Sequence, residues 1–401
     1  MDNSKRIGII GYGNDQWVAG VLYIQSLIIG RFLLNETAKN TSLFLHKDFH
    51  NAKDFLGFSD QIEKISQFDY FYGSAVPVIK RIYIAWKRFY QDKRPIFPDN
   101  NLPRMLAEQQ TEVIFPANAL LSSKYSKTKL ICWIPDFQEL HLPEYSSWVD
   151  RARKQLAFKR MTKVADRIVL SNEFSYQDAC RLAPNYHHKF AILPFTMHLG
   201  KDWRLPDPLE TCKKYDVPDD YLMFPSQFWK HKNHATLFKA LFILKLKGMK
   251  ANMVCTGVFN DPRFPDHCKE LRTFIDDNGL QNQIQILGLL PREDQVQLMR
   301  QARAIVQPSL FEGWSALLED CRSLGKTVFV SDIKMHRDQK PDDAIFFDPK
   351  SPEQLASLIE EHWSVLPSGI DVGREEIGER LNINNLKNFA SKFSEICNSI
   401  D

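Results

Sequence analysis

The chain has little of what marks secreted, membrane-spanning or nucleic-acid-binding proteins. Its seven cysteines, scattered from Cys132 to Cys397, show neither metal-ligand nor disulfide spacing, a pattern typical of a reducing cytoplasm. No apolar run approaches the roughly 20 residues needed to span a bilayer, and the run Ile7–Ile10 is too short for the core of a signal peptide. The net charge of +3 gives no argument for nucleic acid. We therefore expect a cytoplasmic protein that binds no nucleic acid.

The chain has enough apolar residues to form large cores, and its sequence predicts strands that alternate with helices. With 401 residues, 44% of them hydrophobic, it is long enough for two domains. Strand-like runs separated by helical patterns predict mostly parallel, doubly wound sheets. The segment 202–208, rich in proline and charge, lies between the two halves and is predicted to be a linker.

The predicted strands of the first half are Arg6–Ile10, Ser42–Leu45, Val113–Phe115, Leu130–Ile134, Arg167–Leu170 and Phe190–Leu193, and its helices are Gly20–Leu34, Trp148–Ala165 and Glu173–Leu182. The predicted strands of the second half are Leu222–Phe224, Asn252–Cys255, Ile284–Leu287, Ala304–Val306 and Thr327–Val330, and its helices lie near Ala235–Leu246, Asp266–Asn278 and Glu293–Ala302.

The most informative stretch, residues 304–330, predicts one strand–helix–strand unit. Its first strand stops at Pro308, which lacks an N–H and cannot extend a ladder. A loop carrying Glu312 follows, and Ser315 then suits the N-cap of a helix that Gly325 ends. An acidic loop therefore lies at the carboxyl end of a strand, where open α/β sheets bind ligands. The N–H groups at the start of the helix suit a phosphate.

This stretch resembles the motif of the retaining glycosyltransferases of the GT4 family, which starts Pro-Ser-x-x-Glu-Gly and has a second carboxylate eight residues after the first. Counting eight from Glu312 gives Asp320, whereas Glu319 lies one residue earlier. At about 100° per residue, Asp320 lies about 60° from Leu317 at the border of the apolar face, and Glu319 points nearly opposite. We therefore assign the role of the second carboxylate to Asp320.

The resemblance implies the GT-B fold, an α/β architecture in which two doubly wound, Rossmann-like domains face each other across a cleft. The expected domains are an acceptor-side domain at residues 1–200 and a nucleotide-sugar-binding domain at residues 201–380. The final helix, predicted near Asn385–Cys397 within the segment 381–401, either crosses back onto the first domain, as in GT-B enzymes, or lies on the surface of the second. The sequence leaves both alternatives open.

A second motif precedes the first by about 80 residues. The loop 224–233 lies between a strand and a helix that begins near His234, with Asn233 as its N-cap. It resembles the GT4 loop in which a basic residue is followed five positions later by a lysine. Lys232 matches that lysine and is our candidate for the cation that binds the diphosphate. Gln227 stands where the family usually has arginine, so more of the charge falls to Lys232 and the helix at Ser315.

Glycine-containing turns supply the remaining donor-side candidates. Residues 11–20 resemble a GT4 loop that usually has two adjacent glycines, here Ala19 and Gly20, although a simple turn explains the glycines equally well. Gly257 and the turn Gly288–Pro291 also follow predicted strands. By resemblance, backbone groups around Leu290 would hold the nucleobase, whereas the residues alone indicate only a turn.

The loop 133–143 directly follows a strand of the first half and supplies the acceptor-side candidates. Many GT4 members have a His-Asp pair here, but this chain has Pro135 before Asp136, so no catalytic histidine can be assigned to position 135. Asp136 and His141 remain candidates for positioning the acceptor hydroxyl, the alternative for His141 being an exposed loop histidine.

The resemblance implies a mechanism that keeps the anomeric configuration and needs neither cofactor nor metal. Glu312 would lie near the transferred sugar, and Asp320 would bind the ribose hydroxyls of a nucleotide-diphosphate donor. Lys232 and the N–H groups of Ser315, Ala316 and Leu317 would stabilise the departing diphosphate. Glu312, Lys232 and Asp136 are thus the catalytic candidates. We favour front-face displacement, although covalent attack by a carboxylate stays open.

Residues 78–94 carry six cations and one acid among bulky apolar side chains. Such a helix either rests on an anionic membrane surface, as in glycosyltransferases that act on lipid-linked acceptors, or packs its aromatic face in the core with its cations in water. Peripheral attachment at the inner membrane face therefore stays an alternative to a wholly cytoplasmic location.

Three functions fit these patterns. The first is transfer of a sugar to a hydroxyl acceptor, which would be a glycan, a lipid-linked saccharide or a small molecule. The second is a nucleotide-sugar epimerase, which acts on the donor without an acceptor. The third is a protein that binds nucleotide sugars without turnover, which the departures at Ala19, Gln227 and Asp320 make conceivable.

Overall fold

The computed structural model describes residues 5–13, 18–35, 40–46, 55, 62–68, 101–118, 127–200 and 202–400, and the basic segment 78–94 lies outside these ranges. The chain divides into two compact units. The first comprises Met1–Pro135, Ala152–Phe195 and Asn385–Asp401, and the second comprises Asp136–Arg151 and Thr196–Asn384. Every helix in the described ranges is too short or too polar to cross a bilayer.

The first unit is built on a parallel sheet. Its strands in the described part of the chain lie in the order β3-β2-β1-β4-β5-β6-β7. Parallel pairing buries both faces, which suits runs such as Ile7–Ile10 in which all four residues are buried. The strands are β1 (Ile7–Ile10), β2 (Thr41–His46), β3 (Lys64–Phe68), β4 (Val113–Phe115), β5 (Lys129–Ile134), β6 (Arg167–Leu170) and β7 (Phe190–Ile192).

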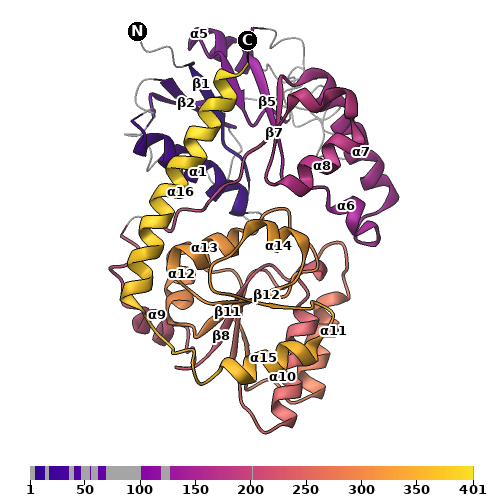
Figure 1. Cartoon of the computed structure of the whole chain (residues 1–401), viewed down its shortest axis with the longest axis vertical. Coiled ribbons are helices and arrows are strands. Elements are labelled where there is room, and N and C mark those ends of the chain that lie inside the picture. Colours follow the sequence, from indigo (N-terminus) through magenta and orange to yellow (C-terminus); the bar gives the residue numbers. More distant parts are fainter. Residues whose placement is uncertain are drawn as a thin grey trace, which may run out of the picture. The chain divides into compact units, whose positions relative to one another are not determined.

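Helices flank this sheet (Figure 1). Aromatic rings pack between the sheet and these helices. The Tyr23 ring in α1 stacks on Trp133 of β5 with ring centroids 4.0 Å apart, and Phe389 of α16 meets Tyr23 edge to face at 5.1 Å. The helices are α1 (Val18–Leu33), α5 (Leu102–Glu108), α7 (Trp148–Val164), α8 (Glu173–Leu182) and α16 (Val372–Asn398), with a 3-10 turn, η4 (Pro184–Lys189). Of these, α7 and α16 extend into both units.

Helix α16 is longer than the predicted Asn385–Cys397, because it begins at Val372. The apolar repeat that predicted its last part is buried, at Leu386, Phe389, Phe393 and Ile396. Residues 385–401 belong to the first unit, and the earlier turns of the helix belong to the second. Gly30 of α1 permits close packing there, since a Cβ on it would lie 2.3 Å from the Leu386 carbonyl oxygen.

The second unit also has a parallel sheet, in the order β10-β9-β8-β11-β12-β13. Strand β8 pairs with β9 on one side and with β11 on the other, so the order of the strands reverses between β8 and β11. The strands are β8 (Leu222–Pro225), β9 (Met253–Thr256), β10 (Ile284–Ile286), β11 (Ala304–Gln307), β12 (Val328–Ser331) and β13 (Ala344–Phe347).

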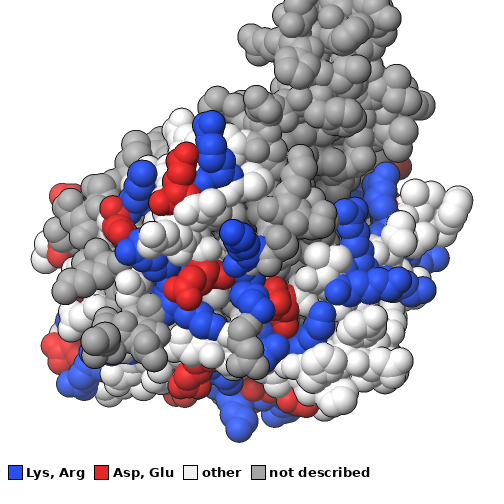
Figure 2. Space-filling model, turned by 90° about the horizontal axis from the view of Figure 1, so that it is seen from above, with Lys and Arg blue, Asp and Glu red and all other residues white. Residues whose placement is uncertain are grey.

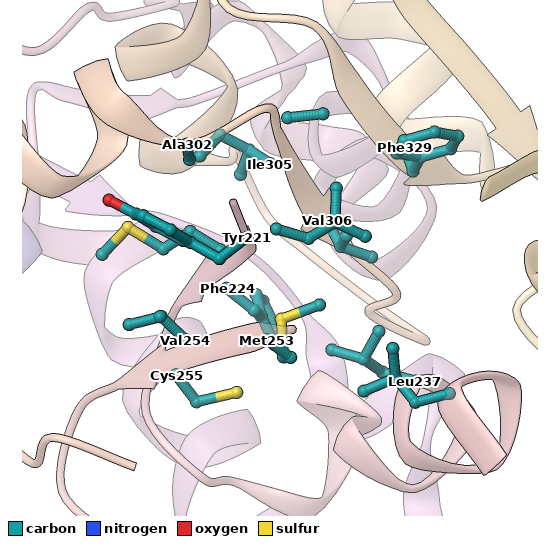
Figure 3. Packing of buried hydrophobic residues seen from close by; sticks show 14 of the residues in the cluster. Tyr221, Phe224, Leu237, Met253, Val254, Cys255, Ala302, Ile305, Val306 and Phe329 are labelled. Atoms are coloured by element: carbon teal, nitrogen blue, oxygen red, sulfur yellow. The ribbon is translucent and has the colours of Figure 1, made fainter. Parts of the chain in front are cut away.

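Side chains from these strands and their covering helices form one large buried cluster, part of which Figure 3 shows. In the sheet, Phe224, Val306 and Phe329 come from three adjacent strands and are fully buried. Helices α10 and α15 pack against each other, as do α12 and α9. The remaining elements are α6 (Gln138–His141), η3 (Pro143–Tyr145), α9 (Pro208–Lys214), η5 (Lys230–Lys232), α10 (His234–Leu246), α11 (His267–Asp277), α12 (Arg292–Gln301), α13 (Ala316–Leu324), α14 (Lys334–Gln339) and α15 (Pro352–His362).

The predicted fold class, α/β with parallel doubly wound sheets, is confirmed, and the predicted strands and helices agree with the structure to within a few residues. The sequence did not predict the strands β3 and β13 or the helices α5, α6, α9, α14 and α15. The predicted linker 202–208 is packed rather than free, because the carbonyl of Trp203 accepts a hydrogen bond from Gln297 of α12. On the face shown in Figure 2, basic and acidic side chains are interspersed, in keeping with the net charge of +3.

Candidate functional site

The candidate site lies in the second unit, at the carboxyl ends of β8 and β11. These two strands flank the point where the strand order reverses, and open parallel sheets leave a crevice for ligands at such a point. Lys232 lies in the short turn η5 after β8, and Glu312 lies in the loop after β11. The fold therefore brings together two loops that are 80 residues apart in the sequence.

Lys232 and Glu312 form an ion pair at this position. The Lys232 Nζ donates to both carboxylate oxygens of Glu312, at 2.7 Å to Oε1 and 2.9 Å to Oε2. The two side chains are only 16% and 9% exposed. Lys232 is therefore not a lysine whose charge is simply solvated at the surface. Removing one partner of a buried pair leaves an uncompensated charge, at a cost of about 3–5 kcal/mol.

The ionisation of Glu312 follows from its neighbours. Burial by itself would raise the pKa of Glu312, but the positive charge of Lys232 is the main cause that lowers it, to about 2. Burial lowers the pKa of His231 to about 3 and that of His336 to about 4, so both rings are neutral near pH 7. Lys232 is therefore the neighbour that keeps Glu312 charged at neutral pH.

His336, to which the sequence assigned no role, is fully buried near this pair. Its Nδ1 lies 2.9 Å from the carbonyl oxygen of Ser331. A carbonyl oxygen only accepts hydrogen bonds, so Nδ1 carries the hydrogen and Nε2 of the neutral ring is an acceptor. That Nε2 has no partner in the described part of the chain.

Helix α13 starts beside the pair with the predicted caps. The Ser315 Oγ accepts the N–H of Leu318 at 3.2 Å, and Gly325 ends the helix in the left-handed conformation, with φ of 60°. Among the described residues, no acceptor faces the N–H groups of Ala316 and Leu317. These two groups lie at the positive end of the helix dipole and are available to an anion.

Two buried glutamines hold Ser315. Gln307, the last residue of β11, accepts the Ser315 hydroxyl at 2.8 Å and donates to Glu312 Oε1 at 3.1 Å. Gln339 of α14 accepts the Ser315 backbone N–H at 3.0 Å and donates to its carbonyl oxygen at 2.8 Å. The Ser315 N–H is therefore already used, and of the three predicted N–H donors only those of Ala316 and Leu317 remain available to a ligand.

Asp320, predicted to bind ribose, forms an ion pair with Arg292 at the start of α12. The Arg292 Nη1 lies 2.7 Å from Oδ2, and its Nη2 lies 2.5 Å from Oδ1. Glu319 is buried as well, at 2% exposed, although the helical wheel placed it nearly opposite the apolar face. It accepts hydrogen bonds from Gln339 and Arg322 on that side. The angular position around the helix is therefore not sufficient to decide which carboxylate binds the donor.

The candidates at the ends of β8 and β9 lie next to each other. Gln227 Oε1 accepts the backbone N–H of Val258 at 2.8 Å, so its side chain braces the neighbouring loop. Gly257 has a φ of 109°, and a Cβ there would lie 2.4 Å from the Ser226 carbonyl oxygen. Its N–H donates to the Gly288 carbonyl oxygen at 2.7 Å, which joins it to the turn that carries the half-buried Leu290.

Asn233 is the N-cap residue of α10, which begins at His234, as predicted. Asn233 adopts the left-handed conformation, with φ of 63°, and makes no capping hydrogen bond. Its Nδ2 instead donates to the carbonyl oxygens of Pro308 and Pro349, at 2.9 and 2.8 Å. The side chain thus ties the Lys232 turn to the loop after β11, which helps to hold the ion pair together.

The remaining candidates are Gly20, Asp136 and His141. Gly20 is buried in α1 of the first unit. Asp136 and His141 belong to the segment Asp136–Arg151, which groups with the second unit. Asp136 Oδ1 accepts the N–H of Gln138 at 2.9 Å, and the His141 ring stacks on Phe311, with centroids 5.6 Å apart. His141 is therefore not simply an exposed loop residue.

Sequence reasoning missed Gln307, Gln339 and Arg292. A polar residue directly before Pro308, at the end of an otherwise apolar strand, was the available signal for Gln307. Gln339 and Arg292 gave no such signal, since each is one of several polar residues in its segment. In the described part of the chain, no three His, Cys, Asp or Glu side chains come together as ligands for a metal ion.

Comparisons with known proteins give one matching family and several matching folds. Residues 213–364, which contain Lys232, Glu312 and Asp320, match the model of the family described as glycosyl transferases group 1. No curated protein sequence matches the chain.

Solved structures match over nearly the whole chain. Anabaena HepE, in a crystal structure in complex with UDP and glucose, is 12% identical, with a TM-score of 0.67 over 98% of this chain and 100% of its own. The sucrose-phosphate synthase from Thermosynechococcus elongatus is 14% identical, with a TM-score of 0.68 over 98% of each chain. A glycosyltransferase from Rickettsia africae is 18% identical, with a TM-score of 0.65 over 99% of this chain and 100% of its own. The chain therefore has the GT-B fold, and its residues 213–364 are similar to the glycosyl transferases group 1 family.

Proposed function

We propose that the chain is a retaining, metal-independent hexosyltransferase of the GT4 type. It moves a sugar from a nucleotide-diphosphate donor to a hydroxyl acceptor, which is a glycan, a lipid-linked saccharide or a small molecule. The observation that carries the proposal is the Lys232–Glu312 pair beside the start of α13. A cation, a carboxylate and two free N–H groups at one sheet edge suit a sugar diphosphate.

Each group has a distinct part in the proposed reaction. An ammonium group has three donors, and two of those on Lys232 are used by Glu312, so one remains for a phosphate oxygen. The N–H groups of Ala316 and Leu317 supply two further donors to the same diphosphate. Glu312, ionised at neutral pH, accepts hydrogen bonds from hydroxyls of the transferred sugar.

The proposed step is a front-face displacement. The bond between the anomeric carbon and the phosphate oxygen breaks, and the bond to the acceptor oxygen forms on the same face. The acceptor proton passes to the leaving phosphate oxygen, so no separate base is needed. Asp136 and His141 are proposed to orient the acceptor hydroxyl.

Thermal-shift screening with UDP, GDP, ADP and TDP sugars tests the donor, because a ligand that binds only the folded protein raises its melting temperature. Incubation of the stabilising donor with and without acceptors then separates transfer from epimerisation. Retention of the anomeric configuration and full activity in EDTA are expected. An inverted product contradicts the retaining mechanism, and loss of activity in EDTA contradicts metal independence.

A second candidate is a protein that binds nucleotide sugars without turnover, which the departures from the family pattern at Ala19, Gln227 and Asp320 make conceivable. Donor binding with no product for any acceptor and no change of the donor supports this alternative.

A further inference from the structure

Gln307 lies between the carboxylate and the helix of the candidate site. It is the last residue of β11 and is 2% exposed. Its Nε2 donates to Glu312 Oε1 at 3.1 Å, and its Oε1 accepts the Ser315 hydroxyl at 2.8 Å. One side chain therefore contacts both halves of the site that follows β11.

The chemistry of these partners fixes the orientation of the Gln307 amide. An ionised carboxylate only accepts hydrogen bonds, so the NH₂ end must face Glu312 and the carbonyl end must face Ser315. The Ser315 oxygen in turn accepts the N–H of Leu318 at 3.2 Å. The hydrogen bonds from Leu318 to Glu312 thus all run in one direction, and such chains reinforce one another.

Glu312 has few other restraints. It lies in a loop without regular structure between β11 and α13, and its second strong partner is Lys232. In the proposed reaction, the third donor of the Lys232 ammonium goes to the diphosphate, so Lys232 is shared between Glu312 and the donor. Gln307 carries no charge and is the last residue of a buried strand, so its contact with Glu312 does not depend on the phosphate.

We propose that Gln307 is a positioning residue that holds the Glu312 carboxylate and the phosphate-facing end of α13 in one fixed arrangement. The inference rests on the proposed glycosyl transfer. It goes beyond it by giving a role to a residue that would touch neither sugar nor phosphate.

Gln297 provides a matched control in the same unit. It is also 2% exposed, and it also makes two hydrogen bonds, donating to the Trp203 carbonyl at 2.8 Å and accepting Arg300 Nη1 at 2.7 Å. It lies in α12 and contacts neither Glu312 nor Ser315. Gln→Met keeps the approximate shape at either position and removes the amide. Both variants lose two buried hydrogen bonds. Gln307→Met loses those to Glu312 and Ser315, whereas Gln297→Met loses those to Trp203 and Arg300.

The first experiment compares the kinetics of these two variants with those of the wild type. We expect Gln307→Met to lower kcat by roughly ten- to hundredfold, the effect of losing a hydrogen bond to a charged group. We expect Gln297→Met to lose a similar amount of thermal stability and to keep kcat within about twofold. Equal losses of kcat in both variants would overturn the inference.

The second experiment uses Gln307→Glu and pH. An ionised glutamate cannot donate to Glu312, whereas a protonated one can donate to Glu312 and accept from Ser315. The activity of Gln307→Glu relative to the wild type should therefore rise as the pH falls from 8 to 5. A ratio that is independent of pH contradicts the inference, and this test remains decisive if Gln307→Met does not fold.

Crystal structures of the unliganded wild type, Gln307→Met or Gln307→Glu, and Gln297→Met separate this inference from the proposed function. A displaced Glu312 carboxylate in the Gln307 variant alone supports the positioning role, and an unmoved one overturns it. A wild type that transfers no sugar from any donor overturns the proposed function, and the structures still decide the role of Gln307.

Discussion

Arg292 and Asp320 form a bidentate ion pair, in which two guanidinium nitrogens donate to the two carboxylate oxygens at 2.7 and 2.5 Å. Their side chains are 16% and 5% exposed, so the pair is largely shielded from water. A carboxylate has about four acceptor positions, and the guanidinium uses two of them. Asp320 can therefore still accept ribose hydroxyls, but the donor meets a carboxylate that Arg292 has already neutralised.

Replacing either Arg292 or Asp320 alone should destabilise the second unit. We expect Asp320→Asn and Arg292→Met each to lower the free energy of unfolding by about 3–5 kcal/mol, because each leaves a buried charge or acceptor unpaired. The double variant Arg292→Met/Asp320→Asn should lose less stability than the sum of the two single effects, because it leaves neither buried charge unpaired. Urea unfolding of the three variants measures the coupling, and simple additivity of the single effects would show that the pair is not coupled.

The affinity for the nucleotide-sugar donor should depend more on Asp320 than on the adjacent Glu319. We expect Asp320→Asn to weaken donor binding more than Glu319→Gln does, since Glu319 is turned toward Gln339 and Arg322. Titration calorimetry on folded samples provides the comparison. If Glu319→Gln were the more damaging change, the register that places the second carboxylate at Asp320 would be wrong.

The Lys232–Glu312 pair should be essential for transfer. We expect Glu312→Gln and Lys232→Ala each to abolish product formation, because the first removes the charge beside the sugar and the second removes the cation for the diphosphate. Circular dichroism should show that both variants are folded. Lys239, which is exposed on α10, provides the control variant Lys239→Ala. Full activity in either site variant would place the reaction elsewhere.

The stability of the second unit should fall in mild acid. His234 is fully buried against Phe228, with ring centroids 4.0 Å apart, and neither of its ring nitrogens has a partner in the described part of the chain. Burial holds its pKa well below the ordinary 6.5. Below pH 6.5, His234 therefore binds a proton in the unfolded chain but stays neutral in the folded chain. The free energy of unfolding is therefore highest above pH 6.5 and decreases as the pH falls.

His234→Phe should remove this part of the pH dependence. Between pH 6.5 and 5 the wild type should lose roughly 2 kcal/mol more stability than the variant, at about 1.36 kcal/mol per pH unit. Chemical unfolding at the two pH values measures the difference, and His188→Phe on the surface serves as the control. Parallel losses in the wild type and His234→Phe would show that the buried ring does not contribute.

Local sequence was sufficient for the elements that carry the site. Pro308, Ser315 and Gly325 act through their own backbone chemistry, so the end of β11 and both ends of α13 were predicted. Other elements were not predictable in this way. Strand β3 (Lys64–Phe68) has three polar residues among its five and lies at the edge of its sheet, and α14 (Lys334–Gln339) is a short helix without a side-chain cap.

The role of Asn233 shows the same limit. Its position before a helix predicted a cap, and asparagine is a common capping residue. Asn233 does hold the N-cap position, but its amide bridges Pro308 and Pro349, which lie 75 and 116 residues away along the chain. No local pattern contains those partners, so the competing contact could not be predicted.

The amino-acid sequence by itself determined the alternation of strands and helices, the caps of α13, the loops that carry Lys232 and Glu312, and the helix that carries Asp320. These features depend on periodicity and on backbone preferences within a few residues. Only the tertiary structure decided which side chains meet: Lys232 with Glu312, Arg292 with Asp320, and Gln307 with both Glu312 and Ser315. The reason is that the order of the strands in the sheet, rather than spacing along the chain, brings the loops at its carboxyl edge within hydrogen-bonding distance.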